Sequence, residues 1–246
     1  MLAYHPDAAW FSQYSLRDGS VPGRRRVPFA HAADRALRGV VRYDWRKGNG
    51  GRLGRLIPRP GEVHTILLYV LAAESESEAV DRLRRVVDWE CGRWHKNVLV
   101  AKPIPLRGHF DLLGAAHPDA RIVHIIRDGR AVAASLRHKF MRSGESTAEG
   151  AHKAAARWSE TLDEVERLGV STLTLRYEDF CADVHGTLTR ALQHARLEPK
   201  RFPFDLVPRS LAATNAARVS ELAPTEFEAV EAAEAPRLRS FGYLGR

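Results

Sequence analysis

The chain is 246 residues long, with 44% hydrophobic and 28% charged residues, which suffices for the core of one α/β domain and leaves little room for a second large one. Its two cysteines, Cys91 and Cys181, lie far apart and lack CxxC spacing, which excludes a disulfide framework and a thiolate zinc site. The formal net charge of +8 indicates an anionic partner such as nucleic acid, an acidic membrane surface or a nucleotide, and charge alone does not choose among them.

Signals for export, membrane insertion and nucleic-acid binding are missing from the sequence. No apolar run is long enough to span a bilayer, and the N-terminal segment has no continuous apolar stretch of the kind that secretory signals carry. The basic residues are dispersed rather than gathered in one tract. We therefore expect a cytoplasmic protein with no membrane insertion and no nucleic-acid partner.

The elements expected in chain order begin with an irregular region. Residues 1–64 are rich in Arg, Gly and Pro and predict short helices and long loops. The glycine-rich run 47–54 lacks a preceding apolar strand and a Gly-Lys-Ser/Thr ending, so we interpret it as a flexible loop and not as a phosphate loop. Apolar spacing then predicts a helix over 77–94, a strand over 97–101, a helix over 106–116, a strand over 121–126, a helix to about 140, a strand over 171–175 and helices over 184–195 and 224–239.

The helix ends carry their own signals. Asp128 can cap the helix that follows the second strand, and Ser146 with Glu149 fits a capping box for the next helix, which Gly169 is expected to close. Strands that alternate with helices predict an α/β fold with a mostly parallel sheet flanked by helices. We expect a single domain over 1–246.

The most specific feature is the segment 122–135. An apolar strand delivers Arg127 to the carboxyl end of the predicted sheet, where ligands of open α/β folds bind. A helix begins at once, so its N-terminal N–H groups face the same spot, and Ser135 lies about two turns into it. The alternative is that Arg127 is a surface ion-pair partner and Ser135 a packing residue.

This segment resembles the 3'-phosphate-binding motif of sulfotransferases, in which a strand ends in Arg-Asp and a Ser follows eight residues after the Arg. The resemblance implies a P-loop-like α/β fold and 3'-phosphoadenosine 5'-phosphosulfate (PAPS) as the co-substrate, without a metal. It also implies a nucleotide-binding core at 97–180, in which Arg127 and Ser135 hold the 3'-phosphate of PAPS.

Two further strand ends are similar to the same family. The segment 173–180 resembles its Tyr-Glu-Asp motif, which implies that Tyr177 lies near the adenine, while Trp158, between the two motifs, is assigned to the core. The strand that ends in Lys102-Pro103 resembles the family's Lys-Thr-Pro or Lys-Thr-His strand, which implies that Lys102 points at the sulfuryl group. A fixed cation there can stabilise the charge that develops on the bridging phosphate oxygen.

The general base and the second phosphate contact are weaker assignments. The acceptor hydroxyl needs a base, and His109 is the nearest candidate, but it follows Lys102 by seven residues where the family's His follows by two. A packing or solvent-facing histidine is the alternative. Arg218, in a C-terminal segment that resembles the family's late phosphate-contacting loop, is the candidate for a second 3'-phosphate contact.

Sulfotransferases of this type open with a strand and a Pro-Arg-Ser-Gly-Thr-Thr-like loop that cradles the 5'-phosphosulfate. This sequence has no such segment, and its start, with His5-Pro6-Asp7, resembles the stretch that follows that loop. Two interpretations stay open, a start codon placed too far downstream, which we favour, and a paralogue that lost the loop. We expect the chain as given to bind PAPS weakly and turn over slowly, and equal turnover in a version extended upstream would contradict this expectation.

The sequence thus favours sulfuryl transfer from PAPS to a hydroxyl or amine of a small-molecule or carbohydrate acceptor. The alternatives are a non-catalytic paralogue or anion-binding module, and another P-loop-like nucleotide-dependent transferase. The acceptor and the oligomeric state stay open.

Overall fold

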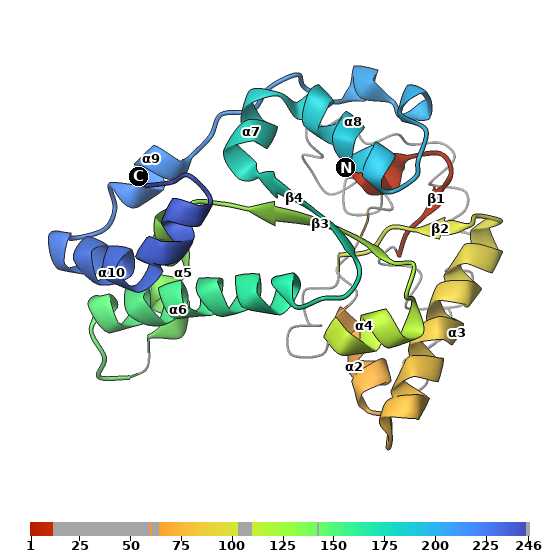
Figure 1. Ribbon diagram of the computed structural model, residues 1–246, viewed down its shortest axis with the longest axis horizontal. Helices are drawn as coiled ribbons and strands as arrows, with labels where there is room; N and C mark the ends of the chain where they lie inside the picture. The colour runs from red at the N-terminus through yellow and green to blue at the C-terminus, as the bar shows by residue number, and fades with distance from the viewer. Residues whose placement is uncertain (12–59, 61–63, 103–109, 142, 245–246) are drawn as a thin grey trace, which may run out of the picture. The chain divides into compact units, whose positions relative to one another are not determined.

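The computed structural model describes residues 1–11, 60, 64–102, 110–141 and 143–244 (Figure 1). Its elements in chain order are η1 (Leu2–Tyr4), β1 (Ala8–Ala9), α2 (His64–Leu71), α3 (Glu76–Trp94), β2 (Val98–Leu99), α4 (Phe110–Ala116), β3 (Arg121–Ile126), α5 (Gly129–Phe140), α6 (Thr147–Glu166), β4 (Ser171–Arg176), α7 (Tyr177–Ala182), α8 (Val184–His194), η5 (Pro199–Arg201), η6 (Phe204–Leu206), α9 (Asn215–Val219) and α10 (Pro224–Ser240). The strands pair as β1 with β2 and β3 with β4. Strands flanked by helices confirm the α/β fold class. Within the described ranges, no helix combines the length and the hydropathy needed to cross a membrane.

The chain divides into two compact units that interleave in sequence. Unit 1 comprises Met1–Ile122, Gly169–Leu173 and His185–Arg209, and unit 2 comprises Val123–Leu168, Thr174–Val184 and Ser210–Arg246. The expectation of a single domain stays a prediction.

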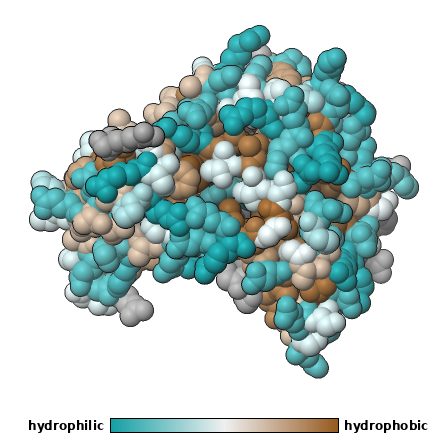
Figure 2. Space-filling view, viewed as in Figure 1, coloured by the Kyte–Doolittle hydropathy of each residue, from teal (hydrophilic) through white to brown (hydrophobic). Residues whose placement is uncertain are grey.

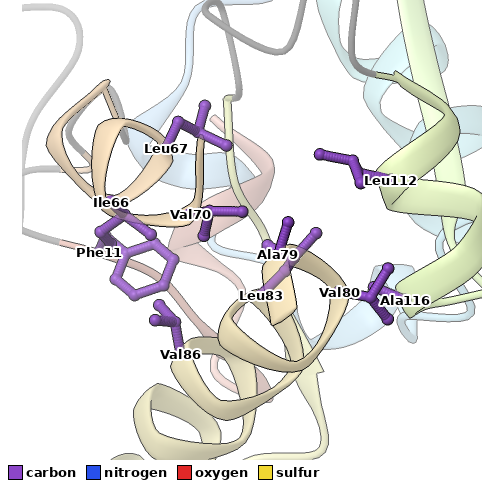
Figure 3. Packing of buried hydrophobic residues seen from close by; sticks show 10 residues of the cluster. All are labelled: Phe11, Ile66, Leu67, Val70, Ala79, Val80, Leu83, Val86, Leu112 and Ala116. Atoms are coloured by element: carbon purple, nitrogen blue, oxygen red, sulfur yellow. The ribbon is translucent and has the colours of Figure 1, made fainter. Parts of the chain in front are cut away.

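Unit 1 contains a short parallel strand pair and a hydrophobic core formed mainly by three of its helices. Ala8 of β1 pairs with Val98 of β2, in parallel register. The core lies where α2, α3 and α4 meet, and Figure 3 shows Val70 of α2 facing α3 and Val80 of α3 beside Ala116 of α4. Its buried members are Phe11, Ile66, Leu67, Val70, Ala79, Val80, Leu83, Val86, Leu112 and Ala116.

Helix α3 is bounded by residues that favour the start and the end of a helix. The Ser75 side chain accepts the Glu78 amide at the N-terminus, and the acidic Glu76 and Glu78 suit the positive end of the helix dipole. His95 ends the helix in the left-handed region, with φ of 53°, so that its amide reaches the last carbonyls. The helix predicted over 77–94 is thereby confirmed.

Unit 2 is dominated by α5, α6 and α10, which pack through small side chains. The capping box predicted at Ser146 and Glu149 is present, because each residue's side chain accepts the other's backbone amide. The buried members of the shared core are Ala133, Ala151, Ala154, Ala155 and Val230. Trp158 is buried in a neighbouring cluster, as predicted. The outer side of α6 carries mainly hydrophilic side chains in Figure 2, as an amphipathic helix requires.

Two local predictions need correction. Helix α6 ends at Glu166 with Arg167 in the right-handed region, so Gly169 is not its C-cap. The strand predicted over 97–101 is ordered as a strand at Val98–Leu99 alone. Cys181 is buried, and Cys91 is half-buried. The first residues of the helix predicted over 106–116 lie outside the described residues. The described part of this helix is α4.

Candidate functional site

The ends of β3 and β4 bring two predicted site residues together. The two strands are neighbours, and Figure 1 draws their arrows pointing the same way. Arg127 follows the last residue of β3, and Tyr177 follows the last residue of β4. The guanidinium carbon of Arg127 lies 4.8 Å from the centre of the Tyr177 ring, which is cation–π distance. The two residues therefore lie at the same end of the strand pair, and their roles at the nucleotide stay predictions.

The Arg127 guanidinium is held along one edge by the start of α9. Its Nε donates to Oδ1 of Asn215 at 2.6 Å, and Nη2 donates to Oγ1 of Thr214 at 2.9 Å. A guanidinium has five N–H donors in a planar fork. Among the described residues nothing accepts from Nη1, so the Nη1 group and the second Nη2 hydrogen are available to an anion.

Glu178, directly after Tyr177, connects the surrounding segments. Its Oε1 accepts from Nδ2 of Asn215 and, at 3.3 Å, from the backbone amide of Asp128. Its Oε2 accepts from the Tyr243 hydroxyl at 2.7 Å. Burial, and then the Glu178 carboxylate, raise the pKa of Tyr243, so this phenol stays protonated and donates. One carboxylate thus ties the end of β3, the start of α9 and the C-terminal segment to α7.

The N-terminus of α5 opens beside Arg127. Asp128 caps it by accepting the Arg130 amide at 3.0 Å, as predicted. The Arg130 guanidinium donates two hydrogen bonds to the same carboxylate, from Nε to Oδ1 at 3.1 Å and from Nη2 to Oδ2 at 2.8 Å. The hydrogen bond with Asp128 raises the pKa of Arg130. The Asp128 charge is therefore neutralised within the protein and does not oppose an anion at Arg127 by itself.

A second acid lies buried behind the first turn of α5. Glu234 of α10 is 0% exposed, and neither of its carboxylate oxygens has a hydrogen-bond partner among the described residues. A Cβ on Gly129 would come 2.2 Å from its Oε2, so the carboxyl fits against the helix start because residue 129 has no side chain. Burial, and then the Asp128 charge, raise the pKa of Glu234 to about 8. Glu234 is therefore uncharged at neutral pH.

Ser135 lies on the exposed side of α5, and its Oγ donates to the Ala131 carbonyl at 2.9 Å. A phosphate dianion accepts hydrogen bonds but does not donate them. To bind one, the Ser135 hydroxyl must rotate away from Ala131, which costs this local bond. Its role at the phosphate stays a prediction.

The remaining predicted residues are not brought to Arg127 by any described contact. Arg218 is exposed on α9, where its Nη1 donates to Glu221 at 2.9 Å in a helical i,i+3 pair. Lys102 is exposed and belongs to unit 1, whereas Arg127 belongs to unit 2. His109 lies outside the described residues. The roles of these three residues stay predictions.

Sequence reasoning missed the residues that hold Arg127. Thr214 was not singled out, because no periodicity or strand end marks it, and Asn215 was only the first residue of the segment 215–219 that resembles a phosphate-contacting loop. Glu178 was visible inside the Tyr-Glu-Asp motif, but its acceptor role depends on the partners that the fold supplies.

Comparison with known proteins gives the family. A model described as "Sulfotransferase family" matches residues 2–201, which is most of the chain. The chain belongs to the sulfotransferase family. Among solved structures, sulfotransferase STF9 from Mycobacterium avium is similar, with a TM-score of 0.62 and 17% identity over 98% of this chain and 72% of that one. A sulfotransferase domain from the curacin biosynthetic pathway aligns with a TM-score of 0.47 and 12% identity over 99% of this chain and 91% of that one. No curated protein matches the sequence significantly.

At 17% identity the likeness to STF9 concerns the fold, and the family assignment rests on the match over residues 2–201. Within this sulfotransferase, the Arg-Asp strand end and the Tyr-Glu-Asp strand end are the two motifs that the structure joins by direct contact.

Proposed function

We propose that this sulfotransferase takes its sulfuryl group from PAPS, that Arg127 binds the 3'-phosphate of this donor, and that the acceptor is a hydroxyl or amine of a small molecule or carbohydrate. The observation that carries the proposal is the Arg127 guanidinium at the N-terminus of α5. It is held by Tyr177 and by the start of α9, and some of its N–H groups have no acceptor among the described residues.

The charges around Arg127 are compatible with a phosphate. The two nearby acids are both engaged by donors, since Asp128 is paired with Arg130 and Glu178 accepts from Asn215 and Tyr243. The free part of the guanidinium can therefore donate to an anion, and two parallel N–H bonds to one phosphate are the geometry that arginine favours. The Tyr177 hydroxyl, which accepts or donates no hydrogen bond among the described residues, would be available to the adenine.

The transfer itself forms a bond between the acceptor oxygen or nitrogen and sulfur. It breaks the bond between sulfur and the bridging phosphate oxygen, and adenosine 3',5'-bisphosphate leaves. The acceptor's proton goes to a general base, for which His109 is the candidate, and Lys102 would stabilise the negative charge on the departing oxygen.

Calorimetric titration with adenosine 3',5'-bisphosphate tests the donor. Wild type is expected to bind it and to bind adenosine 5'-phosphate more weakly. Arg127→Ala should lose about 10- to 100-fold in affinity for the bisphosphate, as expected for a charge-assisted hydrogen bond. Arg157→Ala, which removes a partly exposed α6 arginine paired with Glu160, is the matched control and should bind like wild type.

The two alternatives give different results. An anion-binding module would bind both nucleotides, and inorganic pyrophosphate, with similar and strongly salt-dependent affinities. A transferase that uses another nucleotide would show no preference for the 3'-phosphate. Either result would contradict the PAPS proposal.

A further inference from the structure

The side-chain amide of Asn215 contacts one group that can only donate a hydrogen bond and another that can only accept one. Arg127 Nε can only donate, and it approaches Oδ1 of Asn215 at 2.6 Å. An ionised Glu178 can only accept, and its Oε1 receives a hydrogen bond from Nδ2 of the same amide. An amide can turn by half a rotation and exchange its oxygen and nitrogen with almost no change in shape. In this position the turned amide would set a donor against the Arg127 donor and an acceptor against the Glu178 acceptor.

Glu178 is itself held in place. Its Oε2 accepts from the Tyr243 hydroxyl at 2.7 Å, and Oε1 lies 3.3 Å from the backbone amide of Asp128. Its side chain is half-buried in α7, and Arg176 lies 3.8 Å away, at ion-pair distance. The carboxylate therefore cannot move aside freely when the amide of Asn215 turns.

From this arrangement we infer that Glu178 and Asn215 are positioning residues for nucleotide binding: the Glu178 carboxylate fixes the orientation of the Asn215 amide, which fixes the direction of the Arg127 fork. The inference rests on the proposed function, since it assigns to these two residues the orientation of the group that binds the 3'-phosphate. With Nε and one Nη2 hydrogen occupied by Asn215 and Thr214, the free N–H groups of Arg127 point away from α9 before any ligand arrives. A fork ordered in advance loses less conformational freedom on binding.

The direction in which one substitution changes the affinity for the nucleotide distinguishes this positioning role from a purely electrostatic effect. Glu178→Gln removes a negative charge beside an anion site, and by Coulomb's law alone this should tighten binding of a phosphate. If Glu178 acts as a positioning residue, the neutral amide can no longer accept from both Asn215 and Tyr243, and binding should weaken instead. We expect about tenfold weaker binding of adenosine 3',5'-bisphosphate.

Three comparisons sharpen the measurement. Asp179→Asn removes the same charge from the exposed neighbour of Glu178 and reports the electrostatic effect alone, so it should bind the bisphosphate as well as wild type or slightly better. Tyr243→Phe removes the donor to Oε2 and leaves the Asn215 bond, so its loss should be smaller than that of Glu178→Gln. Binding of adenosine 5'-phosphate should be the same in wild type and in Glu178→Gln, because that ligand lacks the group that Arg127 is inferred to bind.

A double variant tests whether the effect of Glu178 on affinity acts through Arg127. In the Arg127→Ala background, Glu178→Gln should have no further effect on bisphosphate affinity, because the group that it positions is gone. If Glu178→Gln does not fold, as judged by circular dichroism and thermal unfolding, Asn215→Ala takes its place with the same expected pattern.

The outcomes are distinct. If wild type fails to bind the bisphosphate, the proposed function falls and this inference falls with it. If wild type binds, Arg127→Ala loses binding and both Glu178→Gln and Asn215→Ala bind as tightly as wild type or more tightly, the nucleotide site stands and the positioning role is overturned. An equal loss for both nucleotides in a folded variant would also overturn it, because a general structural effect would then explain the loss.

Discussion

At the scale of single residues, the buried carboxyl of Glu234 makes the most definite prediction. Its ordinary pKa of 4.5 is raised to about 8 by burial and by Asp128. Between these two values the folded protein keeps a proton that the unfolded chain has released. Stability must therefore fall as pH rises through this window, by about 1.4 kcal/mol per pH unit, and level off above about pH 8.

Glu234→Gln removes this titration and keeps the shape of the side chain. We expect the variant to unfold at the same temperature as wild type near pH 5 and at a higher temperature near pH 8, since it never carries the buried charge. Thermal unfolding followed by circular dichroism at both pH values measures the difference. Parallel pH profiles for the two proteins would show that Glu234 does not titrate in this window.

The sequence could not reveal Glu234, although it revealed Arg127. Arg127 follows an apolar strand, and the end of a strand in an α/β fold is a position that predicts ligand contact. Glu234 lies four residues from both Val230 and Leu238, on the buried face of α10, but the sequence pattern does not show whether an acid at that position stays buried or reaches solvent. Its burial depends on the approach of α10 to Gly129, which is a tertiary contact.

At the scale of elements, two helical glycines differ in what surrounds them. A Cβ on Gly150 of α6 would come 2.4 Å from the backbone carbonyl of Arg137, so the approach of α6 to α5 requires glycine there. A Cβ on Gly92 of α3 would meet nothing within 4 Å. The two positions should therefore respond to alanine with opposite signs.

Gly150→Ala is expected to destabilise the protein by about 1–3 kcal/mol, because a backbone carbonyl cannot move aside as a side chain can. Gly92→Ala is the matched control and should stabilise the protein by roughly 0.5–1 kcal/mol, the usual gain when alanine replaces glycine inside a helix. Urea unfolding of both variants provides the measurement. A neutral Gly150→Ala would mean that α5 and α6 can separate without cost.

Local sequence signals explain which helices could be predicted and which could not. Helix α3 and the start of α6 have local causes, namely apolar spacing, Ser75 as a cap and the capping box at Ser146, and they were found within about one residue. The short helices α7 and α9 were missed. They have five or six residues each, too few to show a helical period, and α9 starts where Asn215 meets Arg127.

At the scale of the whole molecule, the residues proposed for nucleotide binding and the residue proposed for chemistry belong to different units. Arg127, Tyr177 and Glu178 belong to unit 2, where Arg127 is proposed to bind the 3'-phosphate. Lys102, the candidate for the reacting end, is an exposed residue of unit 1. Local sequence patterns place each residue at the end of a strand but do not give the distance between them. Binding and chemistry can therefore be tested separately.

Lys102→Ala is expected to lower kcat for sulfuryl transfer by about 100-fold while the affinity for adenosine 3',5'-bisphosphate changes little. A cation at the bridging oxygen acts on charge that develops in the transition state, and the product nucleotide would be held at its other end by Arg127. Transfer from PAPS to the best acceptor in a panel of hydroxyl and amine compounds, together with calorimetry, separates the two quantities. Lys200→Ala, which removes an exposed lysine of the same unit, is the matched control and should leave both unchanged. A proportionate loss of affinity and rate in Lys102→Ala would instead make Lys102 a binding residue, and the cation for the departing oxygen would then have to come from elsewhere in the chain.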